Sequence, residues 1–277
     1  MKKRIFKILA FSLAALVLVG AAWFLNALVG NPISKALATR TAEQHLAQVY
    51  GEKDYCIERV SFNFKFGWYH AYIVSPSSRD SSFTLVMDMG GKLLTDTYAD
   101  QVANGTNTAA RIDAAYRTLV NSVLERPDFP CDTHIAFGEI VFVPEEYAND
   151  PSVPDYALIS NDLTLDGIYD ANALGATAGK LTIYAEDGTV THGRLAEILL
   201  DVKALFDGAG VKFYAIDLVL EYPTVPDGDR PEGRVEVMEL PYDQIYEEGM
   251  TDRVKASDQA AKDYYAAQDA QKQAEQP

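Results

Sequence analysis

Cysteine and histidine are scarce in this chain of 277 residues, which holds two cysteines and four histidines. Cys56 and Cys131 show no CxxC or Cys/His spacing, and this excludes a thiol-based metal or redox site. No two histidines fall within a helical turn or an H-x-H spacing, so nothing local supports a histidine metal site. The histidines are His45, His70, His134 and His192. We therefore expect no metal and no other cofactor.

Signatures of nucleophilic catalysis are also missing. The serine pairs Ser77-Ser78 and Ser81-Ser82 lie outside any G-x-S-x-G elbow or S-x-x-K motif, which would place a base beside a hydroxyl. These serines are typical of a hairpin loop. The sequence therefore predicts no catalytic residues and a protein that is not an enzyme.

Basic residues are few beyond the first seven positions. Lys2, Lys3, Arg4 and Lys7 are four of the 24 basic residues, and none of the 40 acidic residues lies among them. From Ile8 onward 20 basic residues therefore face 40 acidic ones. Such a surface repels phosphate backbones and anionic lipid headgroups. We expect no nucleic-acid partner, and the charge argues against a second, peripheral contact with a membrane.

One long apolar segment is present at the N-terminus. Residues 8–29 are 22 positions without a charge, with Trp23 and Phe24 near the far end. A bilayer core requires roughly 20 apolar residues, and Trp is favoured at its boundary. The basic cluster precedes the segment, so the positive-inside rule predicts a cytoplasmic N-terminus and an exported remainder. The sequence thus predicts a single-pass protein of the cell membrane.

A cleaved signal peptide is the rival interpretation of this segment. Gly20, Ala21 and Ala22 loosely match a small-residue cleavage site. The apolar stretch is longer than the roughly 7 to 15 residues of a signal h-region. Its length favours an uncleaved anchor.

The rest of the chain predicts an α+β fold in two small domains. We assign residues 1–30 to the cytoplasmic stub and transmembrane helix, and residues 31–143 to a first domain. Residues 144–158, with prolines among acidic residues, predict a linker. Residues 159–254 predict a compact α/β sandwich. Residues 255–277 predict a polar tail that is either a frayed helix or disordered.

The first domain shows a helix followed by strands of period two. Ser34 is a candidate N-cap for that helix. Val60, Phe62, Phe64 and Phe66 alternate with polar residues, which predicts that all four face a core. Further alternating stretches follow, so we expect an antiparallel meander.

Aromatic residues of the second strand are the candidate binding surface. Trp68, Tyr69 and Tyr72 lie close together in sequence, and aromatics concentrate in interface hot spots. Burial in the core is the more common fate of such residues. The face that Tyr69 occupies distinguishes the two.

The two cysteines leave the disulfide question open. Outside the cytoplasm a bridge between Cys56 and Cys131 is allowed by parity. Two free, buried thiols explain the count equally well.

Three stretches resemble the YfjL-like family of small bacterial membrane-anchored proteins. They are IERVSFNFKFGWYHAYIVSPSS at 57–78, GKLLTDTYADQV at 91–102 and LAEILLDVKALFDGAGVKFYAIDLVLEYP at 195–223. The resemblance implies a bacterial membrane protein with an N-terminal anchor and two ectodomain modules, and it carries no functional residues with it. The helix-plus-meander order of the first module is similar to cystatin-like and PepSY-like folds, which often bind other proteins.

Two functions remain as hypotheses. The first is a noncatalytic envelope protein whose ectodomain binds a protein or peptide partner. The second is an envelope hydrolase or transferase whose site is assembled from residues distant in sequence, with His70 or His134 beside a carboxylate.

Overall fold

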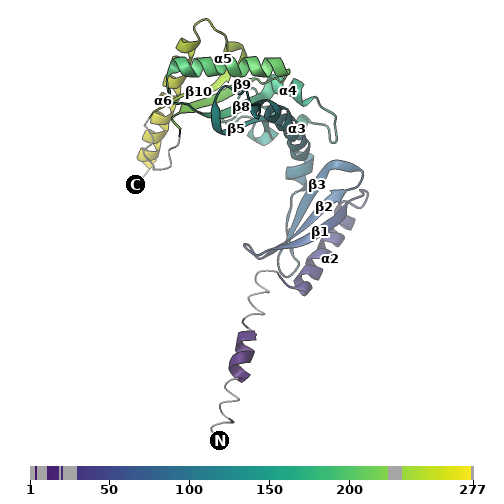
Figure 1. Ribbon diagram of the computed structural model, residues 1–277. Coiled ribbons are helices and arrows are strands. Elements are labelled where there is room, and N and C mark those ends of the chain that lie inside the picture. Colours follow the sequence, from purple (N-terminus) through teal and green to yellow (C-terminus); the bar gives the residue numbers. More distant parts are fainter. Residues whose placement is uncertain (1–3, 5–10, 19, 21–29, 224–232, 276–277) are drawn as a thin grey trace. The chain divides into compact units, whose positions relative to one another are not determined.

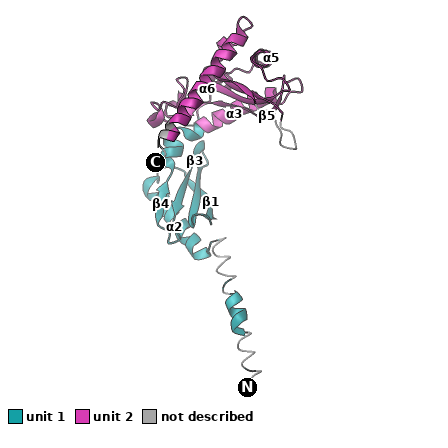
Figure 2. Ribbon diagram, turned by 90° about the vertical axis from the view of Figure 1, so that its left-hand side faces the viewer, with its two compact units in different colours: residues 1–108, 164–166 teal, residues 109–163, 167–277 magenta. Residues whose placement is uncertain are grey.

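The computed structural model describes residues 4, 11–18, 20, 30–223 and 233–275. The chain forms two compact units, one of residues 1–108 with 164–166 and the other of residues 109–163 with 167–277 (Figure 2). The predicted membrane anchor falls largely outside the described residues. Among the residues that are described, no helix is long and apolar enough to cross a membrane.

The first unit contains a helix packed on a four-stranded antiparallel sheet (Figure 1). The strand order follows the sequence, β1-β2-β3-β4, so the predicted helix before an antiparallel meander is confirmed. The elements are α2 (Pro32–Val49), β1 (Cys56–Asn63), β2 (Trp68–Ser75), β3 (Ser78–Met87) and β4 (Leu93–Asp96).

Helix α2 begins one turn before its predicted cap. Asn31 is the N-cap, because its Oδ1 accepts a hydrogen bond of 2.8 Å from Ser34 N, and Pro32 follows at the first helical position. The helix buries the small side chains Ala38 and Ala42. Small residues on the contact face let the helix approach the sheet closely. The core of this unit comprises Ala38, Ala42, Leu46, Tyr69, Ala71, Ile73, Phe83, Leu85, Met87 and Val102.

The β1–β2 turn differs from the prediction. Strand β1 ends at Asn63, so Phe64 and Phe66 lie in the turn, where they are 65% and 60% exposed. Asn63 ends the strand by accepting from Gly67 N at its carbonyl (2.8 Å) and from Lys65 N at its side chain (3.1 Å). Gly67 has φ 71°, a conformation that glycine adopts without strain. The expectation that both phenylalanines face the core is therefore wrong.

The second unit is a mixed four-stranded sheet in the order β10-β9-β8-β5. Strands β8 and β9 are parallel and the other two pairs are antiparallel. Figure 1 shows α5 lying across this sheet. The strands are β5 (Asp132–Ile140), β8 (Gly179–Glu186), β9 (Ala215–Glu221) and β10 (Arg234–Pro241), with a short parallel pair of β6 (Phe142–Val143) and β7 (Leu158–Ile159). The helices are α3 (Thr106–Leu124), α4 (Ala171–Ala178), α5 (His192–Ala209) and α6 (Met250–Glu275).

The division between the units lies near Thr108 and not at residues 144–158. Strand β5 pairs with β8 from Asp132 opposite Glu186 to Ile140 opposite Gly179, and so belongs to the second sheet. The apolar stripe of α3 joins the same core. From the sequence we assigned α3 and β5 to the first domain, with the strands that precede them. The sequence around β5 carries no local signal that its pairing partner is β8, which follows about 40 residues later.

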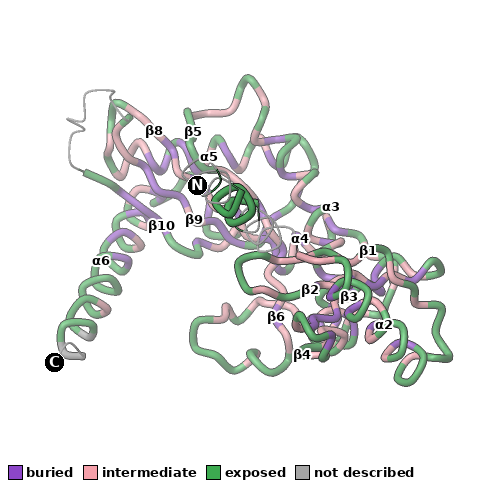
Figure 3. Tube along the Cα trace, turned by 90° about the horizontal axis from the view of Figure 1, so that it is seen from below, coloured by how far each residue is buried: buried purple, intermediate pink, exposed green. Residues whose placement is uncertain are grey.

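The second core joins buried residues of α3 and α5 with those of the sheet. Figure 3 colours the buried residues along the chain purple. Helix α5 ends at Ala209, and Gly210 caps it in the left-handed conformation with φ 70°. Tyr116 of α3 is fully buried, and its hydroxyl donates to Lys212 O at 2.8 Å. Gly175 of α4 lies against the Tyr116 ring, and a Cβ there would be 2.8 Å from Lys212 O.

Helix α6 includes most of the predicted tail. The fold does not end near Val254, because Asp258 and Ala261 are buried. Asp258 Oδ1 accepts from Glu236 N of β10 at 3.1 Å. The side chains of α6 thus cover the outer edge of β10, and the helical alternative for residues 255–275 is the one the structure adopts.

We expect Gly175→Ala to lower the free energy of unfolding by about 1–3 kcal/mol, because the added methyl group overpacks the Tyr116 contact. Gly208→Ala in α5 is the matched control, since a Cβ there meets nothing within 4 Å and alanine favours the helix. Urea denaturation followed by circular dichroism measures both. Equal stability of the two variants would contradict the packing argument.

We expect Asp258→Ala to lower the free energy of unfolding at pH 7 by about 2 kcal/mol, because it leaves Glu236 N without its acceptor. Burial raises the Asp258 pKa, but hydrogen bonds from Lys262 and His192 outweigh burial and hold it below its usual value. A lowered pKa contributes stability above the unfolded value of about 4, and the contribution is lost as the pH falls through the folded value.

The difference in the free energy of unfolding between wild type and Asp258→Ala should therefore become smaller as the pH is lowered below about 4. Urea titrations at several pH values measure it. Asp263→Ala is the control, because Asp263 is exposed on the same helix. A gap that stays constant with pH would show that the charge of Asp258 does not contribute.

Candidate functional site

The three predicted surface aromatics do not share one surface. Tyr69 is 1% exposed and lies in the first core, where its hydroxyl accepts from Asn31 N (2.8 Å) and donates to Asn31 O (3.0 Å). Trp68 and Tyr72 lie on the other face of β2, since side chains alternate along a strand. The guanidinium of Arg59 lies 4.1 Å from the Tyr72 ring centre. Tyr69 therefore has a structural role.

The two histidines named for an enzymatic site have different surroundings, and only His134 lies beside carboxylates among the described residues. Burial lowers the pKa of His70, and its Nε2 has no hydrogen-bond partner in the part of the chain that the structure describes. His134 Nε2 lies 3.5 Å from Glu221, and its Nδ1 lies 3.7 Å from Glu186. Neither histidine lines the cavities described below.

Both cysteines are free thiols, so the disulfide considered from the sequence is not formed. Cys56 is exposed at the start of β1. Cys131 is half-buried, and burial raises the pKa of its thiol to about 12. The described residues contain no group of three histidine, cysteine or acidic side chains that could hold a metal ion.

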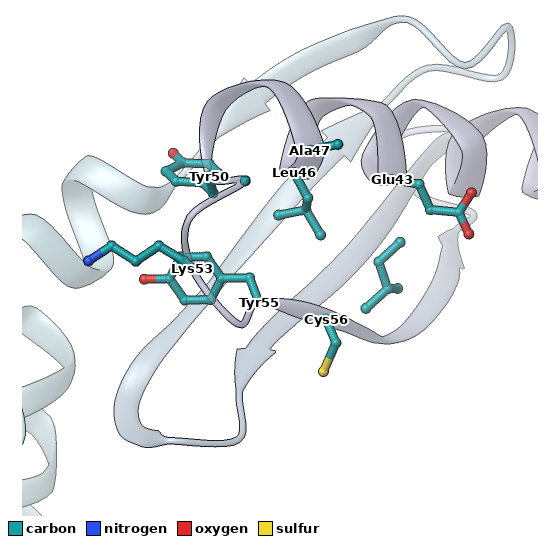
Figure 4. Close-up of a pocket in the computed structure, with 9 residues that line it drawn as sticks. Glu43, Leu46, Ala47, Tyr50, Lys53, Tyr55 and Cys56 are labelled. Carbon is teal, nitrogen blue, oxygen red and sulfur yellow. The ribbon is translucent and has the colours of Figure 1, made fainter.

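A cavity of about 430 Å³ lies between the C-terminal half of α2 and the start of β1 (Figure 4). We call it the α2–β1 cavity. A neighbouring hollow of about 420 Å³ shares the end of α2 with it. The lining residues are Glu43, Leu46, Ala47, Tyr50, Gly51, Lys53, Tyr55, Cys56 and Ile57.

An aromatic cluster holds one end of the α2–β1 cavity in place. The Tyr50 ring lies 5.6 Å from Tyr55 and 4.9 Å from Tyr98. Tyr50 OH donates to Asp96 Oδ2 at 2.8 Å, and His45 Nε2 lies 2.7 Å from the same oxygen. Burial raises the pKa of Tyr50, and the hydrogen bond to Asp96 raises it further. The hydrogen bond from Tyr50 to Asp96 ties the end of α2 to β4 at this wall of the cavity.

The edge of β1 is open beside this cavity. Within the described part of the chain, β1 is hydrogen-bonded to β2 alone and ends its sheet. The outer edge of such a strand presents backbone N–H and C=O groups that can pair with another strand. The pairing register shifts between Ile57 and Arg59, and it is regular from Arg59 to Asn63. The regular segment adjoins the cavity.

A hollow in the second unit has a different character. It measures about 400 Å³ and lies between β10 and α6, lined by Lys180, Glu239 and Tyr264 among others. Lys180 Nζ contacts Asp217 (2.8 Å) and Glu239 (3.4 Å). The φ of 49° at Glu239 belongs to the register shift between Val237 and Leu240. Because α6 covers the edge of β10, no further strand can add there.

Of the residues that line the α2–β1 cavity, the sequence singled out only Cys56, and as a possible disulfide partner rather than as part of a site. Tyr50 and Tyr55 flank a loop and show no periodicity, so no pattern assigned them to a site. One signal was available: the first strand of a meander is an edge strand unless another segment pairs with it. The open edge follows from that topology.

These features define a two-unit α+β protein whose first unit presents an open edge strand beside a helix. The chain belongs to the YfjL-like family: the model of the YfjL-like N-terminal domain matches residues 1–100, and that of the YfjL-like C-terminal domain matches residues 115–255. The gap between the two matches includes the division between the two compact units.

Other comparisons add little. No curated protein matches the chain. A crystal structure of a DUF5037 family protein from Ruminococcus gnavus is 12% identical over 66% of this chain and 74% of that one, with a TM-score of 0.20. A likeness of this size carries no argument about function.

Proposed function

We propose that this chain is a single-pass, noncatalytic binding protein of the bacterial cell envelope. Residues 8–29 anchor it with the N-terminus in the cytoplasm, and the first unit takes an extended peptide segment of a partner protein as an added strand on β1. The observation that supports binding most directly is the open edge of β1 beside the α2–β1 cavity.

Strand addition uses two kinds of contact. Backbone hydrogen bonds to an exposed edge give affinity, and pockets for alternate side chains give specificity. Arg59–Asn63 is the regular part of the edge, and the α2–β1 cavity lies just before it. A cavity of about 430 Å³ falls within the roughly 300–1,000 Å³ usual for ligand pockets.

The residues that line the α2–β1 cavity indicate which kind of peptide side chain would enter it. Leu46 and Ile57 contribute apolar surface, and the two tyrosines add aromatic faces. Glu43 and Lys53 lie at the rim with opposite charges. We infer a peptide with an apolar or aromatic side chain that enters the cavity, followed by residues that pair with Arg59–Asn63.

An enzymatic function remains as the alternative, and one observation favours it. His45 and Asp96 form a histidine–acid pair, and Asp96 also accepts from Tyr50, which lines the cavity. The hydrogen bonds of the described residues do not join His45 to a serine or cysteine nucleophile. The binding function is therefore preferred.

We expect peptides selected from a random library against the full-length protein to bind at this edge. Ala47→Arg should weaken their binding about tenfold or more, because the new side chain fills the cavity from an exposed helix position. Gln44→Arg is the matched control, since Gln44 is exposed on α2 and does not line the cavity. Titration of a labelled peptide measures both.

Hydrogen exchange locates the peptide independently. Backbone amides of Arg59–Asn63 should gain protection when it binds. Peptides that bind Ala47→Arg unchanged, or that leave these amides unprotected, would reject strand addition, as would a library that yields no binder.

We expect Cys56 to report the orientation of the ectodomain. In a Cys131→Ser background, a membrane-impermeant maleimide should label intact cells at Cys56, because that thiol is exposed. Cys56→Ser is the negative control, and cells opened with detergent give full labelling. Labelling that appears only after detergent would overturn the proposed topology.

A further inference from the structure

We propose that the turn between β1 and β2 inserts its aromatic side chains into the interface of the membrane that holds the anchor. We call this turn, residues 64–67, together with Trp68 at the start of β2, the aromatic tip. The inference rests on the anchoring proposed above and adds a second point of contact, made by the folded unit itself.

The aromatic tip lies where the chain enters the first unit. Asn31 directly follows the predicted anchor, and its backbone N–H and C=O are both hydrogen-bonded to the hydroxyl of Tyr69. Tyr69 pairs with Phe62, and the next pair, Asn63 opposite Trp68, closes the hairpin. At about 3.4 Å per residue, the tip is within roughly 10 Å of Asn31 along the strand direction.

The chain leaves this unit at the opposite end. Thr108 Oγ1 donates to Asp80 Oδ2 at 2.9 Å, and Asp80 lies at the beginning of β3, next to the β2–β3 turn. The strands run between these two ends, so the tip shares its end with the start of α2 and not with the start of α3. Asn31, which follows the predicted anchor in sequence, therefore lies at the same end of the unit as the tip.

Large apolar side chains are exposed at this end. Phe64 is 65%, Phe66 60% and Trp68 40% exposed, and the Phe66 and Trp68 rings stack with centres 5.3 Å apart. Ile33 in the first turn of α2 and Met89 in the β3–β4 turn are 74% and 41% exposed. A turn that only joined two strands would not need them, and exposed apolar groups gathered at one end mark an interaction site.

The local charge suits a bilayer surface. Lys35, Lys65 and Lys92 lie at this end against one acidic residue, Asp88, whose Oδ1 accepts from the backbone N–H groups of Gly90 and Lys92. Charges act over about 8–10 Å at physiological salt, so this local excess and not the net charge of the chain decides the contact. The expectation that acidity argues against a second membrane contact does not apply here.

The exposed aromatic side chains and the nearby lysines together fit a lipid interface as the surface that the tip contacts. Trp and other aromatic side chains are favoured at the boundary between hydrocarbon and headgroups, and Lys extends from that depth to the phosphates. The α2–β1 cavity, which would take the side chain of a peptide partner, lies at the other end of α2. The covalent link through Asn31 holds the tip next to the bilayer once the anchor is inserted.

The two tryptophans of the chain make a direct test. Trp23 lies in the predicted anchor and Trp68 in the tip. Full-length Trp23→Phe and Trp68→Phe variants are reconstituted in phosphatidylethanolamine and phosphatidylglycerol vesicles, with and without brominated acyl chains that quench tryptophan on contact. We expect both variants to lose emission in brominated vesicles, about twofold for Trp68 at an interfacial depth.

The outcomes separate the two proposals. Quenching of Trp23 but not Trp68 overturns the tip contact and leaves the anchor in place. Quenching of neither overturns the anchor, and the tip contact with it. A Trp68 that is shielded from aqueous acrylamide but not quenched by brominated lipid indicates burial against protein, and this also overturns the contact.

A tip variant tests insertion against mere proximity. Phe64→Ser with Phe66→Ser in the Trp23→Phe background should reduce the quenching of Trp68, because the tip loses its apolar contacts. Ile135→Ser is the control, since Ile135 is exposed in the second unit. Quenching of Trp68 that the double variant leaves unchanged would count against insertion.

Discussion

The first unit depends on a pair of hydrogen bonds between one hydroxyl and one backbone position. Tyr69 is buried in the sheet and holds both the N–H and the C=O of Asn31, the N-cap of α2. This contact fixes where the helix begins over the sheet, and the length of the helix then fixes where it ends. The α2–β1 cavity lies at that far end. One buried tyrosine therefore sets the position of both ends of the unit.

The edge strands β10 and β1 of the two sheets differ in whether a helix covers them. In the second unit α6 places Asp258 against the edge of β10 and closes it. In the first unit β1 has no partner on its outer edge within the described residues, and its pairing with β2 is interrupted by the register shift at Ile57. Exposed edges favour unwanted pairing between chains, and folds usually cover or distort them. An edge left open beside a cavity is where a binding function has the best physical support.

Part of this fold could be predicted from the sequence. The helix before an antiparallel meander follows from capping residues and from strict alternation, both of which are local. The alternation failed at Phe64 and Phe66, because period two continues through a turn that only the hydrogen bonds of Asn63 reveal. The partner of β5 could not be predicted, since strand pairing over long separations depends on how whole units pack. Of the three candidate surface residues, the structure places Trp68 and Tyr72 on the accessible face of β2 and Tyr69 in the core.

The opposite positions of the first unit's two chain ends have a mechanical consequence. A pull on the two chain ends of the first unit would act on Asn31 at one end of the sheet and on Thr108 at the other. Such a load runs along the strands, so the hydrogen bonds between them would be sheared together and not peeled one at a time. A sheet loaded in shear resists force better than one that is unzipped. The first unit should therefore resist a pull on its chain better than a unit whose two chain ends lay at the same end of the sheet.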